Sequence, residues 1–125
     1  MISVPEVVVE RVAAAIGSGE SLADLAARSA RAVDSEDVVA VVAATFSNSE
    51  RFPSLAVRVA ASLGLPSSVA AFDVQMACSA YPYALYLAGR LSSDMGGKVL
   101  VIDGDVQSPL VDENDHATGR IFADA

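Results

Sequence analysis

The chain has 125 residues, of which 53% are hydrophobic, and it carries 16 acidic side chains against 8 Lys and Arg. This length suits one domain with one core, and the hydrophobic fraction excludes a disordered chain. The net charge of −8 argues against nucleic acid and anionic membrane surfaces as partners, because both repel an acidic protein.

The sequence also bounds the compartment and the kinds of site. No apolar run approaches the ~20 residues needed to cross a bilayer. No charged stretch followed by an apolar core marks a secretory signal near Met1. The single cysteine, Cys78, excludes an internal disulfide and a cysteine-rich zinc site, and it fits a reducing environment. We therefore expect a cytoplasmic protein without a bound metal.

Three stretches predict helices in the first half of the chain. Residues 7–16 have apolar side chains at helical spacing and predict a short helix. A clearer helix is expected over residues 21–33, because the Ser21 hydroxyl can cap the amide of Asp24 ahead of an apolar face. Residues 54–63 predict the third helix, which a glycine and a proline then end.

Short apolar runs between these helices predict strands. The run over residues 38–44 contains only Val and Ala, which is typical of a strand covered on both faces. Further strands are expected over residues 68–74, over 98–103 and from Ile121 onward, with a long helix over 79–92. Alternating strands and helices predict an α/β fold, a mainly parallel sheet covered by helices that are reached through right-handed crossovers.

Cys78 lies where the second of these strands gives way to the long helix. At the start of a helix, free backbone amides and the helix dipole stabilise a thiolate, the reactive form of the side chain. An apolar pocket raises the pKa of a thiol instead, and a lone cysteine is often a small buried hydrophobic residue. The position alone therefore leaves a reactive and a structural cysteine both open.

Four sequence blocks occur in an informative order. They are Ala43-Ala44-Thr45 followed by Phe52-Pro53-Ser54, then the apolar strand that leads to Cys78, then residues 99–106 and residues 121–125. In this order and spacing they resemble the thiolase-fold condensing enzymes, and most closely the beta-ketoacyl-acyl carrier protein synthase III family. The resemblance implies a thiolase-like half-fold, whose nucleophile helix is buried between two similar halves.

The resemblance also implies an activity. Cys78 corresponds to the nucleophile that accepts an acyl group as a thioester before condensation with a malonyl thioester. The implied substrates are acyl-coenzyme A or acyl carrier protein thioesters, and no cofactor is implied. Family members are more than twice this length, and their second half supplies a histidine and an asparagine beside the cysteine. The chain resembles an N-terminal half with a shortened N-terminus (residues 1–19).

We therefore expect part of a split or truncated acyltransferase, to which a separate C-terminal chain could bring the histidine and the asparagine. The alternative is a non-catalytic thiolase-like scaffold or assembly subunit, which the acidic composition favours, because acyl carrier proteins are themselves acidic. The resemblance implies a homodimer in either case, with the strand over residues 98–103 paired to its copy.

The resemblance also directs attention to three aromatic side chains of the acyl pocket. Phe52 corresponds to an aromatic residue that closes the pocket of the partner across the dimer, although packing in its own core is an equal alternative. Phe46 stands where the family has a small or hydroxylated residue, so it narrows the pocket. Tyr81 follows the nucleophile by three residues and is expected to pack in the core. His116, the only histidine, falls in a loop distant from Cys78 and is expected to be solvated.

Overall fold

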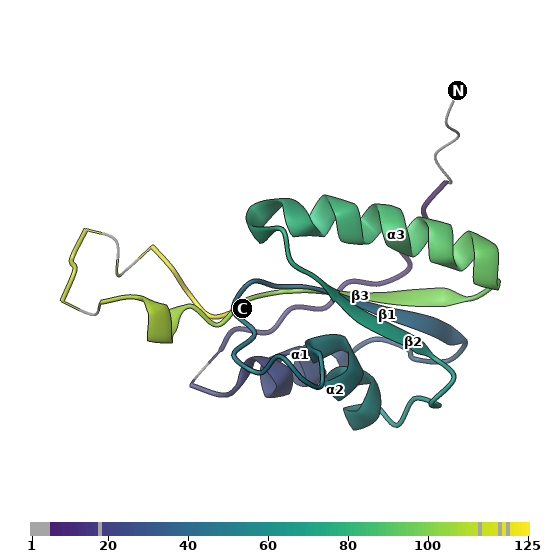
Figure 1. The fold of residues 1–125 in the computed structure, drawn as a ribbon, viewed down its shortest axis with the longest axis horizontal. Helices are drawn as coiled ribbons and strands as arrows, with labels where there is room; N and C mark the ends of the chain where they lie inside the picture. Colours follow the sequence, from purple (N-terminus) through teal and green to yellow (C-terminus); the bar gives the residue numbers. More distant parts are fainter. Residues whose placement is uncertain (1–5, 18, 113, 118, 120) are drawn as a thin grey trace.

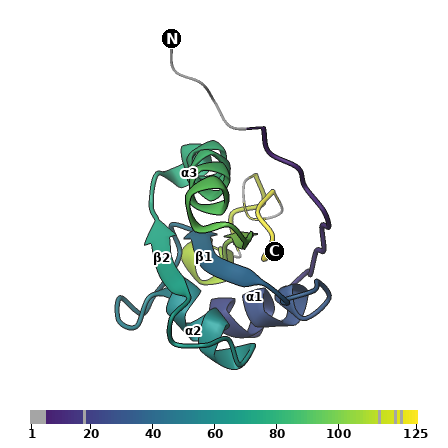
Figure 2. The same cartoon turned by 90° about the vertical axis from the view of Figure 1, so that its right-hand side faces the viewer.

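The computed structural model describes residues 6–17, 19–112, 114–117, 119 and 121–125. A small sheet lies between α3 on one face and the pair α1 and α2 on the other (Figures 1 and 2). The elements, in chain order, are α1 (Leu22–Ala30), β1 (Val38–Ala44), α2 (Leu55–Ser62), β2 (Ala70–Val74), η1 (Ala77–Ser79), α3 (Ala80–Met95), β3 (Lys98–Asp103) and η2 (Ser108–Leu110), where η marks a short 3₁₀ turn.

The sheet has the order β2-β1-β3, and both neighbours run parallel to the central strand β1. Its register brings the ends of the strands together, because Ala44 pairs with Val74 on one side and with Asp103 on the other. The carboxyl ends of all three strands therefore meet at one edge of the sheet, which is also where α3 begins (Figure 1). The predicted parallel α/β arrangement is confirmed.

The strand β1 supplies both halves of the core, because its side chains alternate between the two faces of the sheet. Val41 and Ala43 pack with Leu55 and Val59 under α1 and α2. Val42 and Ala44 face the other way and pack with Ala80 and Ala84 of α3. Burial on both faces explains why this strand consists only of Val and Ala.

Local signals placed the helix ends. The Ser21 hydroxyl accepts a hydrogen bond from the Asp24 amide at 3.2 Å, as the sequence predicts, and Ser54 caps α2 in the same way. At the other end of α3, Gly96 adopts a φ of 72°. This left-handed conformation suits glycine, and it ends the helix two residues before β3.

Two predicted elements are wrong. Residues 7–16 are extended rather than helical, and they pass along one side of the sheet from the level of α3 to that of α1 (Figure 2). No strand begins at Ile121: residues 121–125 have no assigned strand, and Ala125 exchanges two backbone hydrogen bonds with Asp105, which lies beyond the end of β3. Within the described residues, none of the helices is long and apolar enough to cross a membrane.

Candidate active site

Cys78 lies in η1, the short turn that connects the carboxyl end of β2 to the first residue of α3. Its side chain is exposed and forms no disulfide. The preceding residue, Ala77, has a φ of 46°, in the left-handed region that residues with a Cβ rarely adopt. Strained backbone of this kind persists where the surrounding structure holds it, often at functional sites. The expected location of Cys78 just before a helix is confirmed.

Asp103 ends β3 on the same side of the sheet as α3. The neighbouring Val101 packs in the core beneath α3, whereas Ile102 packs in the opposite core, so alternation directs Asp103 to the α3 side. Partial burial and the nearby Asp105 carboxylate raise the pKa of Asp103 above its ordinary value. This exposed carboxyl group, with its raised pKa, lies at the carboxyl end of the sheet, the end from which the Cys78 turn starts.

The loop after β1 runs along this same edge, and Asp105 binds its beginning. One carboxylate oxygen of Asp105, Oδ1, accepts hydrogen bonds from the Thr45 hydroxyl at 2.7 Å and from the amides of Phe46 and Ser47 at 2.9 and 3.0 Å. The Ser47 hydroxyl donates to the same oxygen at 2.8 Å and accepts from the Val106 amide. Thr45 is only 2% exposed, so this network is partly buried.

A second carboxylate, Asp73 of β2, binds the far end of the same loop. It accepts hydrogen bonds from the first two amides of α2, those of Leu55 and Ala56, both at 2.8 Å. It also accepts from the Asn48 side chain at 3.2 Å. Arg58 completes the network, because it donates to Asn48 Oδ1 at 2.5 Å and pairs with the Glu50 carboxylate at 3.0 Å.

The sequence did not single out these carboxylates as a group. Asp73, Asp103 and Asp105 all lie at or just beyond the carboxyl ends of strands. Acidic residues that interrupt or follow otherwise apolar strands are the signal that could have found them. The residues they bind lie up to 60 positions away in the chain, so no local pattern names their partners.

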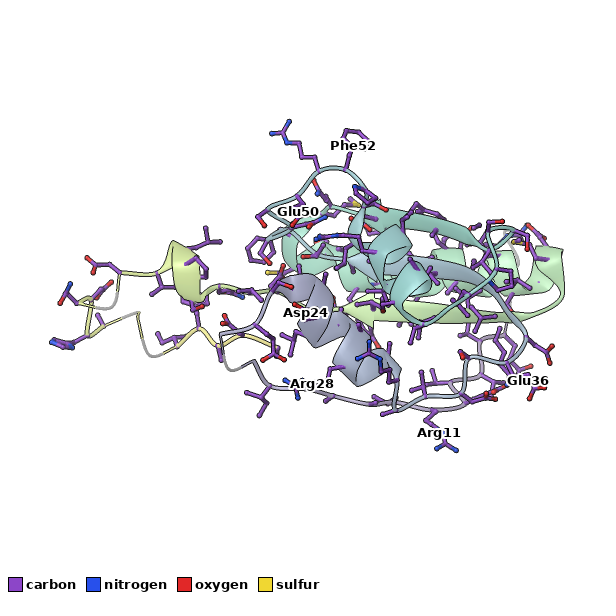
Figure 3. All side chains as sticks on the ribbon, turned by 90° about the horizontal axis from the view of Figure 1, so that it is seen from below. Arg11, Asp24, Arg28, Glu36, Glu50 and Phe52 are labelled. Carbon is purple, nitrogen blue, oxygen red and sulfur yellow. The ribbon has the colours of Figure 1, made fainter. Side chains whose placement is uncertain are left out.

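The three aromatic residues are placed differently from one another. Phe52 lies at the outer tip of the loop near Glu50 and is 91% exposed, so packing in its own core is wrong (Figure 3). Phe46 is 46% exposed beside the Asp105 network. Tyr81 is also 46% exposed in the first turn of α3, which contradicts the expected packing in the core. All three side chains are therefore open to contact from outside this chain.

Other candidate groups lie elsewhere. His116 is exposed and lies within the described residues 114–117. Among the described residues, no three His, Cys, Asp or Glu side chains form a group that could hold a metal ion. The outer face of α3 carries Tyr83 and Tyr86 beside Pro82, and these three residues line an apolar hollow.

Comparison with known proteins agrees with the geometry. Residues 72–125, which include the end of β2, Cys78 and α3, match the family described as 3-Oxoacyl-[acyl-carrier-protein (ACP)] synthase III. The chain is 38% identical over 117 residues to beta-ketoacyl-[acyl-carrier-protein] synthase III of Methylococcus capsulatus, covering 90% of this chain and 36% of that protein. The corresponding protein of Cereibacter sphaeroides is 40% identical over 113 residues, covering 85% of this chain and 35% of that protein.

The fold is shared as well as the sequence. The crystal structure of 3-oxoacyl-[acyl-carrier-protein] synthase III from Aquifex aeolicus superposes with a TM-score of 0.75 at 33% identity, over 87% of this chain and 37% of that one. The chain thus spans about a third of the length of the curated relatives it matches. These findings confirm the resemblance to beta-ketoacyl-acyl carrier protein synthase III and the thiolase-like α/β fold.

Proposed function

We propose that these 125 residues form one domain that carries the nucleophile of a beta-ketoacyl-acyl carrier protein synthase III-type acyltransferase, with Cys78 as that nucleophile. The observation that carries the proposal is the placement of Cys78. It is exposed in a turn that joins a half-buried strand of the parallel sheet to a 16-residue helix, directly after a residue in left-handed conformation. Nucleophiles are often presented at such strand-to-helix turns, where a helix N-terminus favours an anionic group.

The proposed first step is acyl transfer to sulfur. The Cys78 thiolate attacks the carbonyl carbon of an acyl thioester, and amides at the start of α3 stabilise the oxyanion. The bond from the carbonyl carbon to the donor sulfur then breaks. The donor leaves as a thiolate and takes up the proton that Cys78 gave to solvent, so the products are an acyl-Cys78 thioester and a free thiol.

The proposed second step forms a carbon–carbon bond. A malonyl thioester loses CO₂, and the electron pair of the broken bond attacks the acyl carbonyl carbon. The bond to Cys78 then breaks, which returns the thiolate. In the resembled family a histidine and an asparagine assist this step, and we propose that a C-terminal half brings them, as a separate chain if the enzyme is split. No cofactor enters either step.

The substrates follow from the same resemblance. The acyl donor is an acyl-coenzyme A or an acyl carrier protein thioester, in fatty acid biosynthesis or a related pathway of the cytoplasm. Several basic side chains pair with carboxylates, including Arg28 with Glu20 and Arg58 with Glu50. Paired cations attract both an acidic carrier and the phosphates of coenzyme A weakly, so the two donors stand side by side in this proposal. Phe46, Phe52 and Tyr81 would line the acyl pocket, Phe52 from across a homodimer.

Intact-mass spectrometry after incubation with acetyl-coenzyme A tests the first step. We expect the wild-type chain to gain one acetyl group, and the Cys78→Ala variant to gain none. Hydroxylamine, which cleaves thioesters, should remove the adduct. If no adduct appears on the wild-type chain, alone or with a C-terminal-half protein supplied, the proposed nucleophile is wrong.

One observation favours the alternative, a non-catalytic scaffold or assembly subunit. The chain has a net charge of −8, and an acidic protein repels an acidic acyl carrier protein. The two functions differ in the reactivity of the thiol. Under the acyltransferase proposal, Cys78 reacts with iodoacetamide at pH 7 faster than a free cysteine does, whereas an equal or slower reaction favours the scaffold.

A further inference from the structure

We propose that Asp73 and Asp105 form a carboxylate clamp that positions the aromatic loop, residues 45–54, and thereby sets which acyl groups the site accepts. This inference rests on the proposed function for its consequence, but the clamp itself is a property of the fold. Both residues act through the loop they hold, so they are positioning residues rather than catalytic ones.

The two ends of the loop are held from opposite sides. The loop follows the central strand β1, while Asp73 belongs to β2 and Asp105 follows β3, the two strands that flank β1. Asp105 receives hydrogen bonds from the backbone of Phe46 and Ser47, at the start of the loop. Asp73 receives them from the backbone of Leu55 and Ala56, just after its end.

Hydrogen bonds to ionised carboxylates are stronger than neutral ones. Four donors converge on one oxygen of Asp105 at distances between 2.7 and 3.0 Å, and one of them belongs to the 2% exposed Thr45. Partial burial strengthens these contacts further, because water competes less for the donors. The loop conformation therefore depends on carboxylates in or just after the neighbouring strands, together with the loop's own Thr45 and Ser47 hydroxyls.

The clamped loop leaves two aromatic side chains accessible from outside the chain. Phe46 is 46% exposed and its amide is held directly by Asp105. Phe52 is 91% exposed at the tip, and Glu50 beside it is tied to Arg58 of α2 (Figure 3). An exposed aromatic side chain on a rigid loop is suited to forming the wall of a site for an apolar group.

Hydrogen–deuterium exchange tests the clamp without any substrate. In Asp105→Ala the amides of Phe46 and Ser47 should exchange at least about tenfold faster, since each loses a bond to a charged group. Asp73→Ala should do the same for the amides of Leu55 and Ala56. The amides of α1 serve as the internal reference, and Asp94→Ala, which removes an exposed carboxylate of α3, is the matched control. If these four amides exchange at the wild-type rate in both variants, the proposed clamp is wrong.

The acyl selectivity of Cys78 tests whether the clamp sets which acyl groups the site accepts. The readout is the ratio of the initial rates at which octanoyl- and acetyl-coenzyme A acylate Cys78. Because Phe46 narrows the proposed pocket, Phe46→Ala and Asp105→Ala should both raise the ratio, by on the order of tenfold. Asp105→Asn keeps one acceptor oxygen and should restore part of the wild-type ratio. The double variant Asp105→Ala/Phe46→Ala should match Phe46→Ala alone, because Asp105 acts through Phe46.

The outcomes separate the two proposals. If the wild-type chain takes up neither acyl group, the proposed function fails while the exchange data still decide the clamp. If Asp105→Ala slows both acylations equally and leaves the ratio unchanged, its role is only structural and the selectivity inference is overturned. Faster exchange together with a shifted ratio supports the inference in full.

Discussion

At the scale of single residues, Asp103 has the clearest consequence for stability. Burial and the charge of Asp105 raise the pKa of its carboxyl group above the ordinary value of 3.8. Well below that value the carboxyl group is protonated in both the folded and the unfolded chain. It then carries no charge and does not change the free energy of unfolding. As the pH rises toward the folded pKa, the unfolded chain releases its proton first, so the free energy of unfolding falls and then stays lower.

We therefore predict that Asp103→Asn raises the melting temperature at pH 7 and leaves it unchanged below pH 3.8. The physical reason is that asparagine carries no charge to desolvate or to repel Asp105. Thermal melts of both proteins between pH 3 and 8 check this. A lower melting temperature for the variant at pH 7 would show that Asp103 is a stabilising residue and contradict the prediction.

Some residue-level features were predictable and others were not. The capping role of Ser21 and the position of Cys78 before a helix follow from local sequence, because each depends on neighbours within a few positions. The 46% exposure of Tyr81 could not be predicted from local sequence, because it depends on which segments cover the start of α3. The roles of Cys78, Phe46 and Phe52 remain proposals that the experiments above address.

At the scale of elements, α2 has one buried and one exposed side. Leu55 is fully buried between the sheet and α1, while Val57 on the same helix is 40% exposed. Truncating Leu55 removes apolar contacts and leaves a cavity in a core that cannot fully collapse. Truncating Val57 removes contacts mostly with water.

We predict that Leu55→Ala lowers the free energy of unfolding by about 2–5 kcal/mol, and that Val57→Ala changes it by less than about 1 kcal/mol. Urea denaturation followed by circular dichroism measures both values. Equal losses in the two variants would mean that α2 does not pack on the sheet as described.

The N-terminal segment, residues 7–16, is extended although its apolar spacing predicts a helix. Residues 7–16 have the apolar spacing of a helix, but Val7, Val8 and Val9 are β-branched and favour extended backbone. The segment is held in extended form by tertiary contacts: Glu10 pairs with Lys98, and Arg28 donates to the Ile16 carbonyl at 2.7 Å. Such long-range bonds outweigh a weak local preference for helix.

At the scale of the whole molecule, two surfaces invite association. The outer face of α3 exposes Tyr83 and Tyr86, which line an apolar hollow together with Pro82. β3 is an edge strand of the described sheet, a position where strands of different chains can pair, and Glu10 of the N-terminal segment lies beside it at Lys98. Exposed aromatic clusters and edge strands of this kind commonly mark interfaces.

We predict that the chain sediments as a homodimer or a larger species at micromolar concentration. Tyr83→Asp/Tyr86→Asp should weaken self-association or the binding of a C-terminal half, because it places charge in the apolar hollow. Ile16→Asp/Val57→Asp is the matched control, since it adds the same charge at exposed apolar positions beside α1 and on α2, which cover the opposite face of the sheet (Figure 2). A monodisperse wild-type monomer with a cooperative melt would contradict the prediction.

The sequence by itself determined the parallel α/β plan, the strands β1 and β3, the helix caps and the place of Cys78, because each follows from side chains close together in the chain. Only the tertiary structure decided that Asp105 meets Thr45 across 60 positions, and that Asp73 meets Asn48 across 25. Those contacts require two crossovers to place β2 and β3 on either side of β1 in one register. Local sequence patterns do not determine that register, because the register depends on how whole strands and helices pack against one another.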